Sequence, residues 1–177
     1  DRATSNICTA QVLLAVMAGM YAVFHGPDGL KEIAKKIHSN ACILEENLNL
    51  LGFKTPNKSF FDTILVECDS KLIRGKALEK EVNFHYPNDS SVSISINETT
   101  TTNDIYEIIS IFAESKNTKL ENFSNFESLN RIPKEYSRTS SFLTDEVFSK
   151  YKSETSLMRY IKFLEKKDLA LNTSMIS

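Results

Sequence analysis

Lysine, histidine and cysteine are the residues of this sequence that could support covalent, acid–base or metal-assisted chemistry. A lysine that forms a Schiff base is normally presented on a loop beside small residues that bind a phosphate. Lys31, Lys35 and Lys36 instead share one face of a helical pattern, and Lys166 and Lys167 stand in a charged run. These lysines are therefore predicted to be solvated helix surface.

The three histidines and three cysteines also stand apart from any motif. His25, His38 and His85 form no H-x-x-x-H or H-E-x-x-H pattern, so no metal site is predicted. His38 lies one position beyond a buried-face isoleucine on a helical pattern, which favours solvent or the helix rim. Cys8, near a helix start but among apolar neighbours, is expected to be structural rather than nucleophilic.

Cysteine spacing and glycine motifs exclude further site classes. The cysteines are odd in number and form no C-x-x-C pair, which argues against a zinc knuckle or a thioredoxin-type site and favours a reducing compartment. The five glycines form neither G-x-G-x-x-G nor a P-loop, and no G-x-S-x-G elbow is present. The residues themselves thus indicate no catalytic, cofactor-binding or metal-binding position.

Charge and hydropathy exclude two classes of partner. The 177 residues carry a formal net charge of -2 with both signs interspersed, whereas a nucleic-acid binder needs a basic stripe. Residues 12–24 are apolar apart from Gly19 and Tyr21, but a bilayer span needs about 20 residues. The first residues resemble no targeting peptide. We therefore expect no nucleic-acid or membrane partner and a buried helix at this segment.

Two helices are predicted in the first third of the chain. Residues 11–24 are apolar on nearly all sides, which is typical of a helix buried all round. His25-Gly26-Pro27 should end it, because glycine accepts the left-handed C-terminal conformation and proline suits the first turn of a following helix. Apolar residues then recur at helical spacing until Gly52.

The period next changes to that of strands. Residues 60–67 are rich in β-formers, residues 71–80 suit a short helix, and residues 82–86 and 91–96 suit a hairpin with a turn at 87–90. In the second arm Val92, Ile94 and Ile96 share one face. A helix should follow from Thr101 or Thr102, with Asp104 completing a capping box. This order predicts an α+β fold, with an antiparallel or mixed sheet and helices on one face.

The last third of the chain is more polar. Residues 116–141 lose periodicity and are expected to form a linker or wrapping segment. Residues 143–148 and 153–164 suggest two more helical pieces that bury little by themselves. From composition and periodicity alone the chain is a folded module without an active site of its own.

Five segments with distinctive strings follow one another along the chain. They are residues 2–11 (RATSNICTAQ), 25–30 (HGPDGL), 60–63 (FFDT), 92–101 (VSISINETTT) and 142–174, which contain FLT and YKSETSLMRYIKFLEKKDLALNTS. In this order the segments resemble the glycine cleavage system P-protein family. The departures from that family are Arg2 for lysine, Asn97 for aspartate and Ser177 for proline.

The resemblance implies a place at the junction of two tandem halves that each resemble a pyridoxal-phosphate (PLP) enzyme. Residues 1–115 would be a long interdomain helix plus the α+β small domain of a fold-type-I transferase-like half. Residues 116–141 would be a linker, and residues 142–177 the helical start of the second half. Because the family's cofactor lysine lies in a later segment, no catalytic, cofactor-binding or metal-binding residue is assigned to this chain.

The resemblance also implies the chemistry of the parent protein. The family uses pyridoxal 5'-phosphate to decarboxylate glycine and passes the aminomethyl group to the lipoyl arm of the H-protein. We expect a homo-oligomeric parent in the bacterial cytoplasm or the mitochondrial matrix, and no PLP bound by this segment alone. Two other hypotheses are a free-standing, non-catalytic α+β interaction module, and a small domain from another PLP-fold enzyme.

Overall fold

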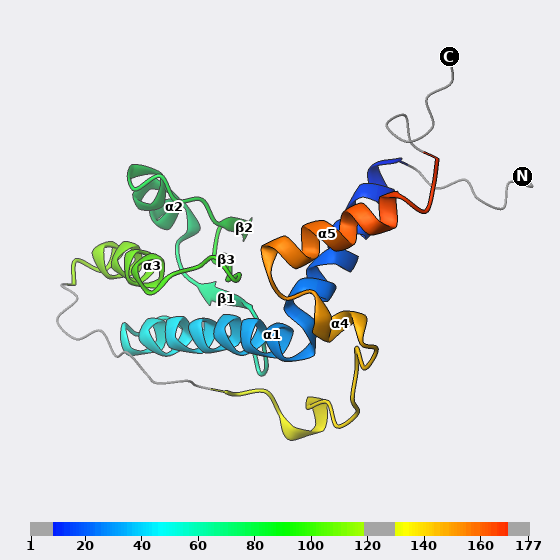
Figure 1. Cartoon of the computed structure of the whole chain (residues 1–177). Helices are drawn as coiled ribbons and strands as arrows, with labels where there is room; N and C mark the ends of the chain where they lie inside the picture. Colours follow the sequence, from blue (N-terminus) through cyan, green and yellow to red (C-terminus); the bar gives the residue numbers. More distant parts are fainter. Residues whose placement is uncertain (1–8, 119–129, 170–177) are drawn as a thin grey trace, which may run out of the picture. The chain divides into compact units, whose positions relative to one another are not determined.

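The computed structural model describes residues 9–118 and 130–169 of the chain, and the side chains from residue 11 on (Figure 1). Residues 32–138 form one compact unit, and the described residues before 32 and after 138 form a second. The elements are α1 (Thr9–Leu50), β1 (Thr63–Glu67), α2 (Ser70–Glu79), β2 (His85–Asn88), β3 (Ser91–Ser95), α3 (Thr102–Ser115), the 3-10 turn η1 (Lys134–Tyr136), α4 (Val147–Lys150) and α5 (Glu154–Glu165).

The three strands form an antiparallel sheet in the order β1-β3-β2. β1 and β3 pair in regular register, with Ile64 opposite Ile94 and Val66 opposite Val92. The register of β2 against β3 shifts between His85 and Asn88. The predicted hairpin is confirmed, but its turn is shorter than expected because Pro87 and Asn88 belong to the strand. Proline is tolerated there because β2 is an edge strand, where a residue without a backbone N–H need not break a hydrogen bond between strands.

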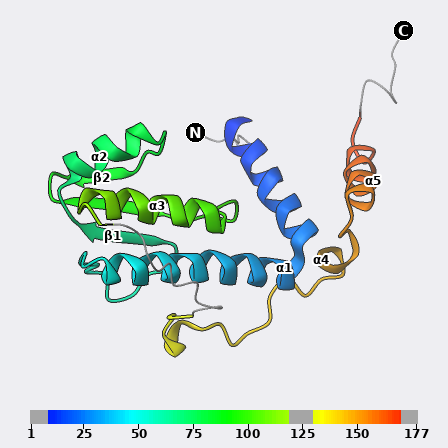
Figure 2. The same cartoon turned by 90° about the vertical axis from the view of Figure 1, so that its left-hand side faces the viewer.

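Alternation along the strands directs one face of this sheet to the core. Ile64, Val66, Val92, Ile94 and Ile96 are buried. They pack against the later part of α1, α2 and α3, whose buried residues share one hydrophobic cluster. In Figures 1 and 2, α3 lies between α2 and the later part of α1. The predicted α+β arrangement, with helices on one face of the sheet, is confirmed.

Glycine and capping residues fix the helix boundaries as predicted. α1 breaks at Gly26, which has φ 62° and ψ -176°, and Pro27 opens the next turn. Gly52, with φ 78°, lies just after the end of α1. At the start of α3 the Thr101 hydroxyl and the Asp104 carboxylate cap each other's backbone N–H groups, and this capping box satisfies donors that a helix start leaves unpaired.

The expected burial of residues 11–24 is wrong for this structure. Leu13 and Leu14 are 62% and 65% exposed, and within the segment Val23 is buried. A helix that is apolar all round needs cover on every side. In this structure residues 11–19 are exposed, and burial increases only toward Val23. No described helix is both long and apolar enough to cross a membrane.

The second helical region agrees with the prediction in its elements and its burial. α4 and α5 lie within or beside the expected segments. α5 contains no buried residue. The predicted domain division at residues 115 and 141 remains a prediction, and residues 119–129 of the expected linker lie outside the described residues, as do Cys8 and residues 170–177.

Candidate functional site

A buried polar cluster lies on the second half of α1, around His38. The expected position of this histidine at solvent or on a helix rim is wrong, because His38 is 2% exposed. Its ring stacks on Phe61 at 5.9 Å between centroids and lies 5.8 Å from the ring of Phe60. The loop before β1 and the residues near Arg131 cover it. The spacing along α1 could not show this, since both covering segments are distant in sequence.

The hydrogen bonds of His38 define its protonation state. Nδ1 lies 2.8 Å from the carbonyl oxygen of Phe61, and the backbone N–H of Arg131 donates to Nε2 at 2.9 Å. A carbonyl can only accept and a backbone N–H can only donate. The ring is therefore neutral, with its hydrogen on Nδ1 and the lone pair of Nε2 facing Arg131.

Arg131 also ties the residues that follow α3 to α1 through two carboxylates. Its Nη1 lies 2.5 Å from Glu45 Oε2, and its Nη2 lies 3.0 Å from Glu46 Oε2. The other oxygen of Glu45 accepts from Asn49 at 2.7 Å and from Thr55 at 2.9 Å. Such a set of donors compensates the cost of burying a carboxylate.

Cys42 completes the cluster, with Sγ 3.4 Å from His38 Nε2. A cysteine beside a histidine can be a nucleophile when the thiolate is stabilised and accessible. Burial, however, raises the pKa of the Cys42 thiol, although Arg131 acts in the opposite direction. Cys42 is also fully buried. The cluster is thus a structural network rather than a catalytic pair.

The signal for this cluster is present in the sequence and was missed. His38, Cys42 and Glu45 recur at intervals of four and three on one helix, which places them on one face. A face that carries His, Cys and Glu among buried residues indicates a polar network. Its partner Arg131 is 86 to 93 positions away, and local spacing cannot identify it.

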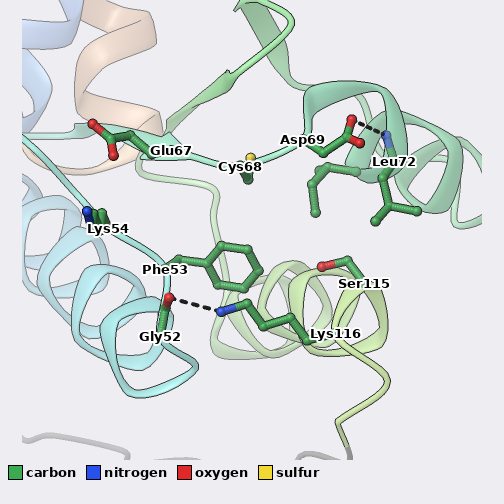
Figure 3. A pocket seen from close by; sticks show the side chains of 10 residues that line it. Gly52, Phe53, Lys54, Glu67, Cys68, Asp69, Leu72, Ser115 and Lys116 are labelled. Atoms are coloured by element: carbon green, nitrogen blue, oxygen red, sulfur yellow. Dashed lines mark hydrogen bonds between the residues drawn. The ribbon is translucent and has the colours of Figure 1, made fainter.

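A separate pocket of about 420 Å³ lies in the unit of residues 32–138 (Figure 3). Phe53 stands at its centre, with Lys116 Nζ 4.1 Å from the ring centroid. Lys116 also donates to the carbonyl oxygens of Leu51 and Gly52, both at 2.9 Å. The lining residues are Gly52, Phe53, Lys54, Glu67, Cys68, Asp69, Leu72, Ile73, Ser115 and Lys116.

The lining of this pocket does not fit pyridoxal phosphate. Lys116 is held by two carbonyl oxygens rather than directed into open space. The start of α2, the helix N-terminus that could bind a phosphate, is already capped by the carboxylate of Asp69, which accepts from the N–H groups of Lys71 and Leu72. Burial and the Asp69 charge raise the pKa of Cys68 to about 11, so its thiol stays protonated at neutral pH.

The remaining residues considered from the sequence lie at dispersed positions. Lys35 pairs with Glu32 at 2.6 Å on the surface of α1, and Lys31 with Asp28 at 3.6 Å, as the surface prediction requires. His25 packs against the ring of Tyr21, and His85 is exposed on β2. Within residues 9–118 and 130–169, no group of three or more His, Cys, Asp or Glu side chains could hold a metal ion.

Comparison with known proteins gives one consistent family. The family model of the glycine cleavage system P-protein matches residues 1–112. Over 177 residues the chain is 56% identical to a glycine dehydrogenase (decarboxylating) of Flavobacterium johnsoniae, covering 100% of this chain and 19% of that protein. It is 44% identical over 179 residues to the mitochondrial glycine dehydrogenase (decarboxylating) of Mus musculus, covering 99% of this chain and 18% of that protein.

A solved structure gives a weaker likeness. The 8-amino-7-oxononanoate synthase of Francisella tularensis superposes with a TM-score of 0.40 at 15% identity, over 46% of this chain and 26% of that one. The chain spans about a fifth of the length of the curated relatives it matches.

Proposed function

The chain belongs to the family of glycine cleavage system P-proteins, and from this membership we propose that it is part of a glycine decarboxylase in which it serves as scaffold. The match over residues 1–112 and the identity of 56% along all 177 residues carry the proposal. The parent would use pyridoxal phosphate to decarboxylate glycine and would deliver the aminomethyl group to the lipoyl arm of the H-protein. A homo-oligomeric parent and its compartment, bacterial cytoplasm or mitochondrial matrix, stay predictions.

The contacts of the reactive side chains support the scaffold role. The His38 ring binds two backbone groups and the carboxylates of Glu45 and Glu46 bind Arg131. Lys116, which lies over the Phe53 ring in the pocket, donates to the carbonyls of Leu51 and Gly52, just after the end of α1. Each of these groups therefore joins elements of the fold to one another. Pyridoxal phosphate, when bound in the parent, supplies the electron sink for decarboxylation, and we propose that its lysine lies outside this chain.

The exposed apolar face of α1 supports a place within a larger polypeptide. Soluble proteins rarely leave contiguous large apolar side chains open to water. Val12, Leu13, Leu14, Val16 and Met17 are all at least 40% exposed. Since the relatives are about five times longer than this chain, we propose that another part of the parent polypeptide covers this face, which makes the helix a packing element between domains.

Two measurements test the proposed function. The parent polypeptide, supplied with pyridoxal phosphate and lipoylated H-protein, should release carbon dioxide from glycine. The 177-residue chain alone should show no internal-aldimine absorbance band on addition of pyridoxal phosphate, and borohydride should trap the cofactor on no single lysine. A parent that is inactive with glycine would contradict the decarboxylase assignment, and cofactor trapped at one lysine of the isolated chain would contradict the scaffold role.

A further inference from the structure

Residues 130–138, the strap, lie against α1 through contacts of Arg131, one of which is a hydrogen bond to the His38 ring. The strap includes η1, and Ile132 and Pro133 are half-buried. Arg131 contacts α1 twice over, with its backbone N–H on His38 and its guanidinium on Glu45 and Glu46. Figure 1 shows this segment, drawn in yellow, running beside α1.

The contact at His38 is compatible with one charge state of the ring. In the imidazolium form both ring nitrogens carry hydrogen and both can only donate. Nε2–H would then face the Arg131 N–H at a site where the two nitrogens now lie 2.9 Å apart. On the other side, Nδ1 keeps its bond to the Phe61 carbonyl in either form. Protonation therefore breaks the hydrogen bond between His38 and the strap, while the bond from Nδ1 to Phe61 stays in place.

We propose that His38 is a proton-operated latch that holds the strap on α1 when neutral and releases it when protonated. The strap-bound state binds one proton fewer than the released state. By linkage, the equilibrium constant for strap binding falls as the pH falls. Histidine is the side chain whose charge normally changes between about pH 5 and 8, which sets the interval for a test. This latch goes beyond the scaffold role, which does not require a response to pH.

The groups around the ring leave His38 as the proton acceptor of this latch. From α1 the thiol of Cys42 faces Nε2 at 3.4 Å, and burial, which raises the pKa of this thiol, keeps it uncharged at acidic pH. From the loop before β1 the neighbours are the uncharged rings of Phe60 and Phe61. The charged groups nearby, Glu45, Glu46 and the guanidinium of Arg131, face one another.

The test is amide hydrogen exchange of Arg131 in the full chain, followed by NMR between pH 8 and pH 5. The protection factor, which corrects for the intrinsic pH dependence of exchange, should fall about tenfold or more on acidification, as expected for loss of a buried hydrogen bond. The ¹⁵N shifts of the His38 ring should report the Nδ1–H tautomer at pH 8 and titration in step with this fall.

Three variants distinguish the contribution of the His38 ring to the pH response from the contributions of other residues. In His38→Gln an uncharged amide can accept from Arg131 and donate to Phe61, so protection should no longer depend on pH in this interval. His85→Gln removes an exposed histidine and should keep the wild-type response. Arg131→Gln keeps the backbone N–H but loses both ion pairs, so protection should be lower throughout and still fall with pH.

Specific results would overturn the latch. One is an Arg131 protection factor that stays constant while the His38 ring titrates. Another is a fall of the same size in His38→Gln, because a response carried by Glu45, Glu46 or Cys42 survives that substitution. If His38→Gln does not fold, an Nε2–H tautomer in the wild-type ring at pH 8 is sufficient to reject the proposal. These measurements need neither glycine nor cofactor, so failure here leaves the decarboxylase assignment untouched.

Discussion

Glu45 and Glu46 are adjacent in sequence, but their carboxylates have different surroundings. The side chain of Glu45 is 11% exposed and that of Glu46 is 31% exposed, although both bind the same guanidinium. Glu45 additionally accepts hydrogen bonds from Asn49 and Thr55. The cost of altering a charge rises with its burial and with the number of donors left unpaired. These two residues therefore form a matched pair for measuring the contribution of the network.

We predict that Glu45→Gln lowers the free energy of unfolding by roughly 1–3 kcal/mol, because in either orientation the new amide nitrogen would face donors, either the Arg131 guanidinium or Asn49 and Thr55. Glu46→Gln should cost less than about 1 kcal/mol, as for a more solvated ion pair. Urea denaturation at neutral pH measures both. Equal losses of unfolding free energy in the two variants would show that the greater burial of Glu45 does not increase the cost of its substitution.

At the residue scale the sequence predicted local contacts better than distant ones. The Thr101 and Asp104 capping box lies within four residues and was predicted correctly. The burial of His38 was predicted wrongly because Phe61 and Arg131, which bind its ring, are 23 and 93 positions away. A helical periodicity indicates which residues share a face, but it does not indicate which later segments cover that face.

At the element scale the kink of α1 depends on a glycine that no other residue can replace without strain. Gly26 has φ 62°, and a Cβ built there would lie 2.3 Å from the backbone oxygen of Phe148 and 2.6 Å from Lys152 Nζ. The lysine end can move, whereas the Phe148 carbonyl belongs to the α4 backbone. Gly19 lies on the same helix, and a Cβ there would meet nothing within 4 Å.

We predict that Gly26→Ala destabilises the chain by roughly 2 kcal/mol or more, from the left-handed conformation together with the contact to Phe148. Gly19→Ala should instead stabilise α1 by roughly 0.5–1 kcal/mol, because alanine loses less backbone entropy within a helix. Thermal unfolding followed by circular dichroism compares the two. A destabilisation of similar size in both variants would mean that the kink does not require glycine.

Strand boundaries were less accurate than helix boundaries for a physical reason. The helix ends coincide with Gly26, Gly52 and Thr101, whose backbone conformations or side chains mark a boundary directly. β2 was expected at residues 82–86 but occupies His85–Asn88. Its position follows from pairing with β3, where the register shifts between His85 and Asn88. Pairing of this kind is a property of two strands, so one strand's composition does not determine it.

At the scale of the whole molecule, the two compact units differ in how much apolar surface they cover. The unit of residues 32–138 contains a continuous core formed by three helices and one sheet face. The unit that contains the start of α1 leaves Leu13, Leu14 and Met17 more than half exposed. The hydrophobic pattern predicted that residues 11–24 are buried, and this is wrong for most of them. Burial needs a covering surface, and among the described residues the side chains of residues 11–19 are exposed.

This exposure predicts different effects of one triple substitution in the isolated chain and in the parent polypeptide. Replacing Leu13, Leu14 and Met17 together by serine should reduce self-association of the isolated 177-residue chain, because it removes apolar surface from water. In the parent polypeptide the same change should lower the melting temperature, since the helix would lose its packing against the covering domain. Sedimentation velocity of the chain at increasing concentration and thermal unfolding of the parent measure the two effects.

Leu78→Ser provides the matched control, because Leu78 is also exposed, at 57%, but belongs to the short helix α2. A single exposed leucine is ordinary on a protein surface, so this change should have little effect in either setting. A triple variant that leaves the parent's melting temperature unchanged would show that the start of α1 stays open to water there as well. The apolar face would then have to be explained by contact with another molecule rather than with another domain of the same polypeptide.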